Sequence, residues 1–356
     1  MVIMHVVAAK VWGGGEQYVY DVSREQKASG HKVVVVVDSS VKEIAERFSD
    51  AAEVETASIR SPLGLMALNK LASLVKKHGV EAVFYHSGSI AVTVALLKSI
   101  TGVKLVFVKH NLSQFKNDFF HRWLFGKIDA VVCVSESVLT QQKETAPVCF
   151  ANKFHVIYNG IDDKQFSYSQ RHRENNRRFT FGYAGRLVEN KGILVLLEAA
   201  AELRRREIPF ELRICGKGNP AFEKEIRGKM VELELQEQVK MLGYTRDMPA
   251  FYNSIDAFIL PSITKESFGL ALCEAMYSGC AVIATNSGAQ EEIVTNNETG
   301  LIVEPSSVQE LVMAMVRLID NEELTEMLSE KGHNKVAECF TISNCCAKID
   351  ELLKTI

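Results

Sequence analysis

Residues 32–37 read Lys-Val-Val-Val-Val-Val, and this run is the strongest indication of the fold. Five β-branched residues in a row predict a strand that is buried on both faces, as in a parallel sheet covered by helices. An apolar run at 1–9 and an amphipathic stretch at 16–28 precede it, and Gly30 is the predicted helix stop. The order strand, helix, strand predicts a doubly wound α/β domain.

The same alternation continues along the chain and restarts after residue 178. Further strands are predicted at 80–85, 103–110, 130–134, 180–184, 211–215, 239–242, 257–260 and 281–284. Residues 167–178, between the two series, are polar and basic without periodicity, which indicates a linker. We therefore expect two Rossmann-like domains, at 1–166 and 167–340, that face a central cleft where such sheets bind ligands.

The composition excludes several classes of protein. A formal net charge of −3 gives no basis for nucleic acid as a partner, although the N-terminal half is mildly basic and suits a phosphate or an anionic membrane surface. The longest apolar stretch, 90–108, is interrupted by Lys98, Gly102 and Lys104 and does not predict a membrane span. The eight cysteines show no metal-ligand spacing, so free thiols in a reducing cytosol are expected.

The first candidate site is the segment 261–275, Pro-Ser-Ile-Thr-Lys-Glu-Ser-Phe-Gly-Leu-Ala-Leu-Cys-Glu-Ala, which follows a predicted strand and opens a helix. The backbone amides of Phe268, Gly269 and Leu270 would form an anion site, because the first amides of a helix lack helical partners. Glu266 and Glu274 flank these amides and suit the hydroxyl groups of a sugar and a ribose. The two carboxylates also fit a plainer interpretation, in which one complements the helix dipole and the other is solvated.

A second candidate, Gly185-Arg-Leu-Val-Glu-Asn-Lys-Gly192, directly follows the first predicted strand of the C-terminal domain. Arg186 and Lys191 supply two cations for a diphosphate, and they would stabilise charge on a leaving nucleoside diphosphate without a metal. The alternative is a basic loop that faces solvent, which a position between a buried strand and a helix disfavours.

Two further features belong to the N-terminal domain. The glycines of Trp12-Gly-Gly-Gly-Glu-Gln17 follow the first strand and would let a phosphate or an acceptor approach the backbone. His110 ends a predicted buried strand, and it either contacts the transferred sugar or is a structural histidine.

Residues 216–221, Gly-Lys-Gly-Asn-Pro-Ala, match a GxGxxA dinucleotide-binding pattern after a predicted strand. This match alone is weakly specific. It leaves a nicotinamide-dependent oxidoreductase open as an alternative function.

Together these residues resemble the retaining glycosyltransferases of family 4, which have the GT-B fold. The resemblance rests on the pairs Glu266/Glu274 and Arg186/Lys191. It runs to about Pro305 and also includes Gly13–Gly15, His110, Asn159–Asp162, Cys215–Gly218 and Leu242–Tyr244. Gly288-Ala289 departs from the Gly-Gly that is usual in the family, which puts a minor backbone contact in doubt.

The resemblance implies an enzyme that moves a hexose or N-acetylhexosamine from a nucleotide diphosphate sugar, with UDP as the default nucleotide, to a glycan or lipid-linked acceptor. It implies no metal and no cofactor, and a setting in lipopolysaccharide or surface polysaccharide assembly. The catalytic residues are then Glu266, Arg186, Lys191 and His110, without a protein general base. The donor-binding residues are Gly14, Gly15, Arg186, Lys191, Gly216, Gly243, Tyr244, Thr245, Glu266, Phe268, Gly269, Leu270 and Glu274.

The resemblance also bears on the last helix and on the acceptor. The family's last helix often packs on the N-terminal domain, and residues 341–356 are the candidate here. The acceptor site is expected at Trp12, Lys109, Asn111 and Lys116.

Residues 109–122, with Trp123, are basic and aromatic. A face with Phe119, Phe120 and Trp123 suits peripheral contact with the cytoplasmic membrane, whereas a packed interior helix is the alternative.

Two rival functions remain besides the oxidoreductase. A sugar-nucleotide epimerase of similar fold needs an acid/base set that the sequence does not assemble, and a non-catalytic sensor is disfavoured by the intact Glu and Arg/Lys pairs.

Overall fold

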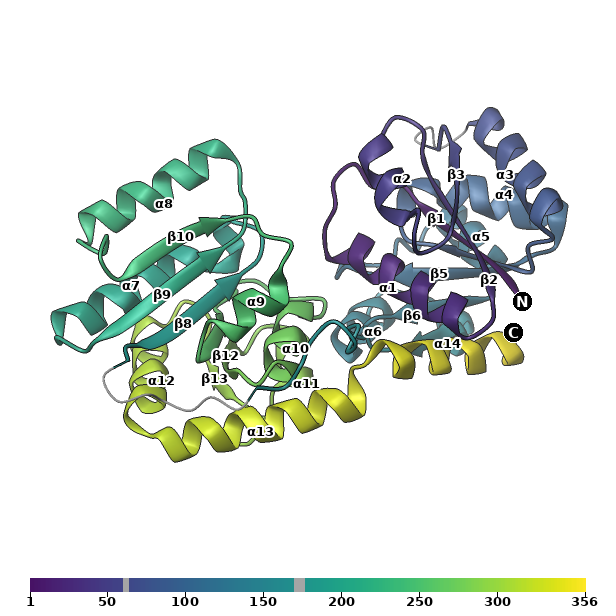
Figure 1. The fold of residues 1–356 in the computed structure, drawn as a ribbon. Helices are drawn as coiled ribbons and strands as arrows, with labels where there is room; N and C mark the ends of the chain where they lie inside the picture. Colours follow the sequence, from purple (N-terminus) through teal and green to yellow (C-terminus); the bar gives the residue numbers. More distant parts are fainter. Residues whose placement is uncertain (60–63, 170–176) are drawn as a thin grey trace. The chain divides into compact units, whose positions relative to one another are not determined.

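The computed structural model describes residues 1–59, 64–169 and 177–356, and the chain forms two α/β units (Figure 1). One unit contains Met1–Ile161 together with Ile342–Ile356, and the other contains Asp162–Thr341. The first boundary lies after Ile161, whereas we expected it after residue 166. The stretch expected as a linker, 167–178, lies for the most part outside the described residues.

The N-terminal unit is built on a parallel sheet of seven strands in the order β3-β2-β1-β4-β5-β6-β7. The strands are β1 Val2–Val7, β2 Lys32–Asp38, β3 Glu53–Ala57, β4 Ala82–Tyr85, β5 Lys104–Lys109, β6 Ala130–Cys133 and β7 Phe154–Val156. The valines of the opening run lie in β2 with at most 4% of each side chain exposed. The predicted strand with two buried faces is therefore confirmed, and it pairs in register with β1, Val33 opposite Ile3.

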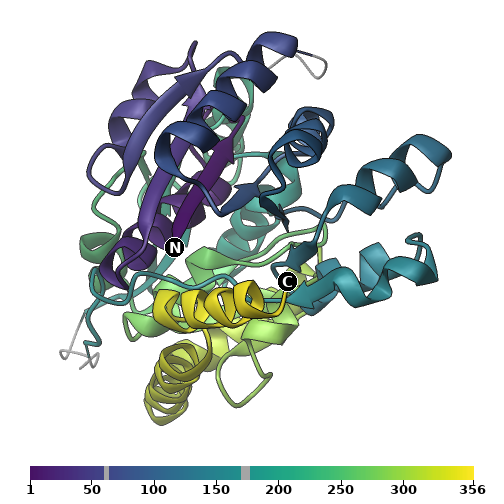
Figure 2. The same cartoon turned by 90° about the vertical axis from the view of Figure 1, so that its right-hand side faces the viewer.

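Helices cover this sheet and complete the alternation that the sequence predicts. They are α1 Gly14–Ala28, α2 Lys42–Phe48, α3 Leu65–His78, α4 Ala91–Thr101, α5 Phe119–Lys127, α6 Glu136–Lys143 and α14 Ile342–Thr355. The last of these, α14, packs against α1, where the Ser343 hydroxyl donates to Glu25 Oε1 at 2.8 Å. Figure 2 shows α14 (yellow) beside the N-terminal unit from a second direction.

The C-terminal unit contains a parallel sheet of six strands in the order β10-β9-β8-β11-β12-β13. The strands are β8 Phe179–Ala184, β9 Phe210–Cys215, β10 Val239–Gly243, β11 Ala257–Leu260, β12 Ala281–Thr285 and β13 Leu301–Val303. The helices are α7 Ile193–Arg205, α8 Pro220–Glu232, α9 Met248–Asn253, α10 Leu270–Tyr277, α11 Gln290–Ile293, α12 Val308–Asp320 and α13 Glu322–Cys339. Both units are doubly wound, as the sequence predicts.

The strand orders locate the part of each sheet where a ligand site is expected. The direction of winding reverses between β1 and β4 in the first unit and between β8 and β11 in the second. In open parallel sheets, ligands bind beyond the carboxyl ends of the strands at this reversal. The loops that follow β1, β4, β5, β8 and β11 are therefore the expected positions of ligand-binding residues.

Candidate functional site

Two loops of the C-terminal unit meet beyond the carboxyl ends of β8 and β11. The loop after β8 contains a short 3-10 turn, Glu189–Lys191, and the loop after β11 leads into α10. The amide of Ile263 donates to the carbonyl oxygen of Asn190 at 3.0 Å, and the Asn190 side chain reaches Thr264 Oγ1 at 3.3 Å. The two segments predicted separately from sequence therefore form one structural unit.

Lys191 and Glu266 form an ion pair where these loops meet. The ammonium nitrogen lies 2.5 Å from Glu266 Oε1, and the two side chains are 17% and 16% exposed. The hydroxyl of Ser262 donates to the same carboxylate oxygen. Such a half-buried pair with an added hydrogen bond is held in one geometry, so that an incoming anion or hydroxyl group meets an ordered cation and acceptor.

Arg186 lies at the start of the same loop and is exposed. Its carbonyl oxygen accepts a hydrogen bond of 2.9 Å from the hydroxyl of Tyr183. Burial raises the pKa of Tyr183, the negative charge of Glu266 raises it further, and the charge of Arg186 opposes both effects. The arginine and the glutamate therefore both lie within electrostatic reach of this tyrosine. Among the described residues no carboxylate forms an ion pair with Arg186, so its charge is available to a ligand.

Two glycines allow these loops to approach each other. Gly192 has φ +73°, and a Cβ there would lie 1.9 Å from the carbonyl oxygen of Pro261. Gly216 has φ +149°, and a Cβ there would lie 1.9 Å from the carbonyl oxygen of Gly185. The Gly216 amide also donates to the Gly243 carbonyl at 2.8 Å. Any other residue at 192 or 216 would force the loops apart.

The same packing explains the GxGxxA pattern without a dinucleotide. Gly218 forms a bridge with Leu187, and a Cβ at 218 would lie 2.3 Å from the Leu187 carbonyl oxygen. The space beside Gly216 and Gly218 is thus filled by the loop after β8. The missing side chains serve contact between loops, and the oxidoreductase alternative loses the observation on which it rested.

Glu274 lies on α10, the helix that follows the loop containing Glu266. Its Oε2 accepts a hydrogen bond of 2.7 Å from the hydroxyl of Tyr252, which comes from α9. Burial raises the pKa of Glu274, and the hydrogen bond from Tyr252 lowers it in part. Glu274 and Glu266 have different hydrogen-bond partners, which are Tyr252 for Glu274 and Lys191 with Ser262 for Glu266.

The helix start predicted near residues 268–270 is confirmed. Gly269 is the N-cap with φ +155°, and α10 begins at Leu270, close to the predicted helix start. Phe268 is buried, with 3% of its surface exposed, and its ring packs against Phe340. The loop predicted to line the base, 243–245, is mostly open to solvent, with Tyr244 58% exposed.

Three histidines gather at the switch point of the N-terminal unit. His5 lies within β1 and is fully buried. His86 directly follows β4, and His110 directly follows β5. Their ring nitrogens lie 3.1 Å apart for His5 and His86 and 3.0 Å apart for His86 and His110. Gly15 lies over the last ring, since a Cβ at that position would be 4.0 Å from His110 Cγ.

The sequence indicated only His110 and the glycine loop in this cluster. The other two histidines could have been found from their positions in the sequence. His5 is a polar residue inside the apolar strand β1, and His86 directly follows the strand β4. A parallel sheet brings both together once the order β1-β4-β5 is known.

The residues predicted for the acceptor are spread over the N-terminal unit. Trp12 packs on Phe48 with 5.2 Å between ring centroids, and the Arg47 guanidinium lies 4.8 Å from its ring centre. Lys109 is buried and donates to the hydroxyl of Ser113, which in turn donates to Asn111 Oδ1 at 2.6 Å.

Burial lowers the pKa of Lys109 to about 8. Its hydrogen bond ties it to the loop that follows β5. Lys116 is exposed.

Helix α5 is packed on one side only. Leu124 and Phe125 are buried at 7% and 5% exposure, whereas Phe119 is 89%, Phe120 49% and Trp123 37% exposed. The alternative of a helix packed inside the domain is therefore wrong, because the aromatic side faces out of the unit. Within the part of the chain that the structure describes, no helix combines the length and the apolar character that crossing a membrane requires.

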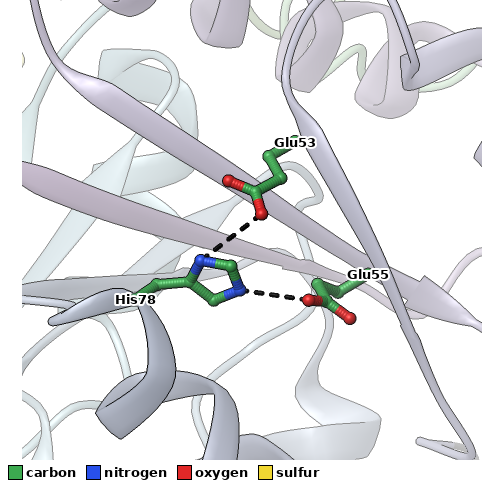
Figure 3. Close-up of side chains that lie close together, drawn as sticks. All are labelled: Glu53, Glu55 and His78. Atoms are coloured by element: carbon green, nitrogen blue, oxygen red, sulfur yellow. Dashed lines mark hydrogen bonds and ion pairs between the residues drawn. The ribbon is translucent and has the colours of Figure 1, made fainter.

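A separate cluster at the edge of the N-terminal sheet contains Glu53, Glu55 and His78 (Figure 3). Nδ1 of His78 lies 3.5 Å from Glu53 Oε1, and Nε2 lies 3.1 Å from Glu55 Oε1. Lys77 also bonds Glu55, and this hydrogen bond lowers the pKa of that carboxyl. A metal ion would compete with the lysine and would use one ring nitrogen, whereas here both nitrogens meet carboxylates. The cluster fits an ion-pair network that holds the edge strand β3 to α3.

Two family models match the chain in succession. The model described as Glycosyltransferase Family 4 matches residues 12–165, and the model described as Glycosyl transferases group 1 matches residues 164–335. The two matches thus run from residue 12 to residue 335 and include every residue predicted for the donor or acceptor site.

Several named proteins are similar to this chain. A lipopolysaccharide core biosynthesis mannosyltransferase of Rhizobium meliloti is 26% identical over 259 residues, which are 69% of this chain and 71% of that protein. A UDP-Gal:alpha-D-GlcNAc-diphosphoundecaprenol alpha-1,3-galactosyltransferase of Escherichia coli is 23% identical over 81% of this chain and 79% of its own. The crystal structure of Anabaena HepE with UDP and glucose has a TM-score of 0.83, at 21% identity over 99% of each chain.

Proposed function

Because the chain belongs to the family 4 glycosyltransferases and has their GT-B fold, we propose that it transfers a hexose or N-acetylhexosamine from a UDP-sugar to a glycan or lipid-linked acceptor. The reaction would retain the anomeric configuration and serve lipopolysaccharide or surface polysaccharide assembly. A relative named for lipopolysaccharide core biosynthesis supports the setting, and a relative named for UDP-Gal together with a solved neighbour in complex with UDP supports the donor.

The observation that carries the proposal is the ion pair of Lys191 and Glu266 beside the charge of Arg186, which no carboxylate of the described chain neutralises. A departing nucleoside diphosphate gains negative charge, and two cations fixed beyond a parallel sheet stabilise it as it forms. We therefore assign the diphosphate to Lys191 and Arg186 and the amides at the start of α10. Glu266, oriented by Ser262, would accept hydrogen bonds from hydroxyl groups of the donor sugar.

The remaining donor contacts follow from the position of each loop. Glu274 would accept the ribose hydroxyls, because its carboxylate is already oriented by Tyr252. The exposed residues Gly243, Tyr244 and Thr245 would border the base. In the N-terminal unit, Gly14, Gly15 and His110 would face the donor sugar. We propose no metal, since cationic side chains take the role that a metal would have.

A thermal-shift and turnover experiment tests the proposal. The full chain is heated with UDP, GDP and ADP and with their sugars, and release of the nucleotide is then measured with lipid-linked glycan acceptors. We expect UDP to raise the melting temperature most and a UDP-sugar to be turned over. The anomeric proton coupling of the product reports retention. A chain that no nucleoside diphosphate stabilises, and that releases none, would contradict the function.

The exposed aromatic side of α5 is the basis of a second proposal, peripheral contact with the cytoplasmic face of the inner membrane. Phe119 and Trp123 are suited to the boundary between headgroups and acyl chains, and Arg122 between them is exposed as well. Flotation with vesicles of phosphatidylglycerol and phosphatidylethanolamine tests it. The double variant Phe119→Ser/Trp123→Ser should lose binding, whereas Val148→Ser, at a residue that is 90% exposed, should not.

A further inference from the structure

Four side chains of the N-terminal unit form one continuous line of hydrogen bonds. Gln26 Oε1, on α1, lies 2.9 Å from His5 Nε2. His5 Nδ1 lies 3.1 Å from His86 Nε2, and His86 Nδ1 lies 3.0 Å from His110 Nε2. The rings are stacked, with centroids 5.4 Å apart for the first pair and 5.3 Å for the second. We call Gln26, His5, His86 and His110 the histidine relay.

The relay crosses the switch point of the sheet. Its rings come from β1 and from the residues directly after β4 and β5, which are neighbours in the sheet. The inner end is closed, because His5 and Gln26 have no exposed surface and the His5 ring stacks on Phe84. The outer end, His110, lies under the glycine loop and against the edge of the Tyr18 ring, with centroids 5.0 Å apart.

Burial favours the neutral form of all three rings. Burial lowers the pKa of His5 and of His110 to about 4. Burial also lowers the pKa of His86 far below its usual value, and charge on either neighbouring histidine would lower it further. A neutral imidazole has one N–H donor and one acceptor nitrogen. Each ring in the line can therefore donate only once and accept only once.

This restriction leaves two opposite proton orders along the line, and the orientation of the Gln26 amide selects one of them. With the Gln26 amide oriented so that its carbonyl oxygen, which can only accept, faces His5, the His5 ring carries its proton on Nε2 and accepts at Nδ1. The Nε2 group of Gln26 is buried and has no hydrogen-bond partner among the described residues. His86 then donates from Nε2 and accepts at Nδ1, and His110 donates from Nε2. One lone pair is left over, on Nδ1 of His110, and no described residue donates a hydrogen bond to it.

We propose that Gln26, His5 and His86 are positioning residues that hold His110 in the Nε2–H form, so that its Nδ1 accepts a hydrogen bond from a hydroxyl group of the donor sugar. The identity of the ligand rests on the proposed function, whereas the proton arrangement is a property of the protein alone. His110 then selects a sugar with a hydroxyl group at this position and rejects a carboxylate there. It does not act as a proton donor.

The proton arrangement is measured directly by NMR on the full chain labelled with 15N-histidine. Long-range proton–nitrogen correlations distinguish Nε2–H from Nδ1–H rings, and loss of a signal in His5→Asn, His86→Asn or His110→Asn assigns each one. We expect the Nε2–H pattern for all three rings, unchanged between pH 8 and pH 6. An Nδ1–H pattern at His110 would overturn the proposal, because the line would then run in the opposite direction.

Variants of Gln26 test whether the inner end controls the outer one. Gln26→Glu keeps an acceptor oxygen facing His5 and should preserve the Nε2–H pattern. Gln26→Met removes the acceptor, so an Nδ1–H population should appear at His110 and kcat/KM should fall about fivefold, the effect of one neutral hydrogen bond. A pattern at His110 that is the same in both variants and in the wild type refutes the relay.

A matched control separates positioning from stability. Phe84→Leu removes the ring that stacks on His5 and should lower the melting temperature without changing the proton pattern. A change of pattern in this variant equal to that of Gln26→Met would assign the effect to packing and overturn the proposal. An intact pattern in a protein without transferase activity would leave the relay standing and contradict the proposed function instead.

Discussion

Replacing Lys191 by methionine removes one partner of the Lys191–Glu266 ion pair and leaves the shape of the side chain nearly unchanged. At 2.5 Å between the charged atoms, and with an effective dielectric constant of about 20 for groups near the surface, the direct attraction is on the order of 6 kcal/mol. The two side chains are only 17% and 16% exposed, so both charges have lost most of their hydration. This desolvation cost offsets most of the direct attraction. Without Lys191 the Glu266 carboxylate keeps its desolvation cost and loses its partner, so we expect the free energy of unfolding to fall by about 2 kcal/mol.

That loss corresponds to a melting temperature about 4–8 °C lower for a unit of this size. The effect on turnover is expected to be larger, because Lys191 would face charge that develops only in the transition state. Loss of one such donor costs about 100- to 1,000-fold in kcat. The double variant Lys191→Met/Glu266→Gln has no unpaired charge, so it should regain most of the stability but none of the activity.

Thermal unfolding by circular dichroism and release of UDP in a coupled assay measure the two effects on the same samples. Lys229→Met is the matched control, since its partner Glu232 is 64% exposed and lies on the same unit. Lys229→Met should lower the melting temperature only slightly and leave the turnover unchanged. If Lys191→Met keeps a kcat within about threefold of the wild type, the charge argument based on the transition state is wrong.

Three further variants probe other parts of the structure. Glu274→Gln should raise the melting temperature while weakening UDP binding roughly tenfold to 100-fold in calorimetry, because it removes a charged acceptor. Burial raises the folded-state pKa of Glu274, so the ionised form of this side chain destabilises the folded protein. The destabilisation is absent below the pKa of the unfolded state and complete above the pKa of the folded state. The difference in melting temperature between Glu274→Gln and the wild type should therefore increase as the pH rises. Gly216→Ala should lower the free energy of unfolding in urea by about 3 kcal/mol, since its Cβ would lie 1.9 Å from a backbone oxygen, whereas Gly228→Ala, with no atom within 4 Å, should gain about 0.5–1 kcal/mol. Leu353→Asp, at a residue of α14 that is 1% exposed, should unfold the N-terminal unit at a lower temperature in differential scanning calorimetry, and an unchanged thermogram would contradict the packing of α14 on that unit.

The strands that are recognisable from sequence share one physical property. Runs such as Val33–Val37 are apolar at every position because both faces of a central parallel strand are covered. The strands that the sequence did not predict are short or lie at an edge. Edge strand β3 alternates Glu53, Val54, Glu55 and Thr56, and only part of it is buried, so its pattern differs little from that of a loop. β7 and β13 have three residues each, which is too short for a periodic signal.

The chemistry of single loops is likewise readable from the chain. A cation pair after one strand and carboxylates around a helix start are local patterns, because strand, loop and helix are consecutive in sequence. For that reason the amino-acid sequence alone identifies Arg186, Lys191, Glu266 and Glu274 as candidates. Their roles in donor binding stay a prediction.

Contacts between loops from different strands were decided only by the tertiary structure. The pairing of Lys191 with Glu266 joins residues that are 75 positions apart, and the His5–His86 contact joins residues 81 positions apart. These contacts can be predicted only when the strand order is known. The neighbouring positions of β1, β4 and β5, and of β8 and β11, bring loops that are far apart in sequence next to each other. The amino-acid sequence by itself determined the alternation of buried strands and helices and the residue types offered at each loop. The sheet topology decided which of them touch, because hydrogen bonding between parallel strands is what sets their carboxyl ends side by side.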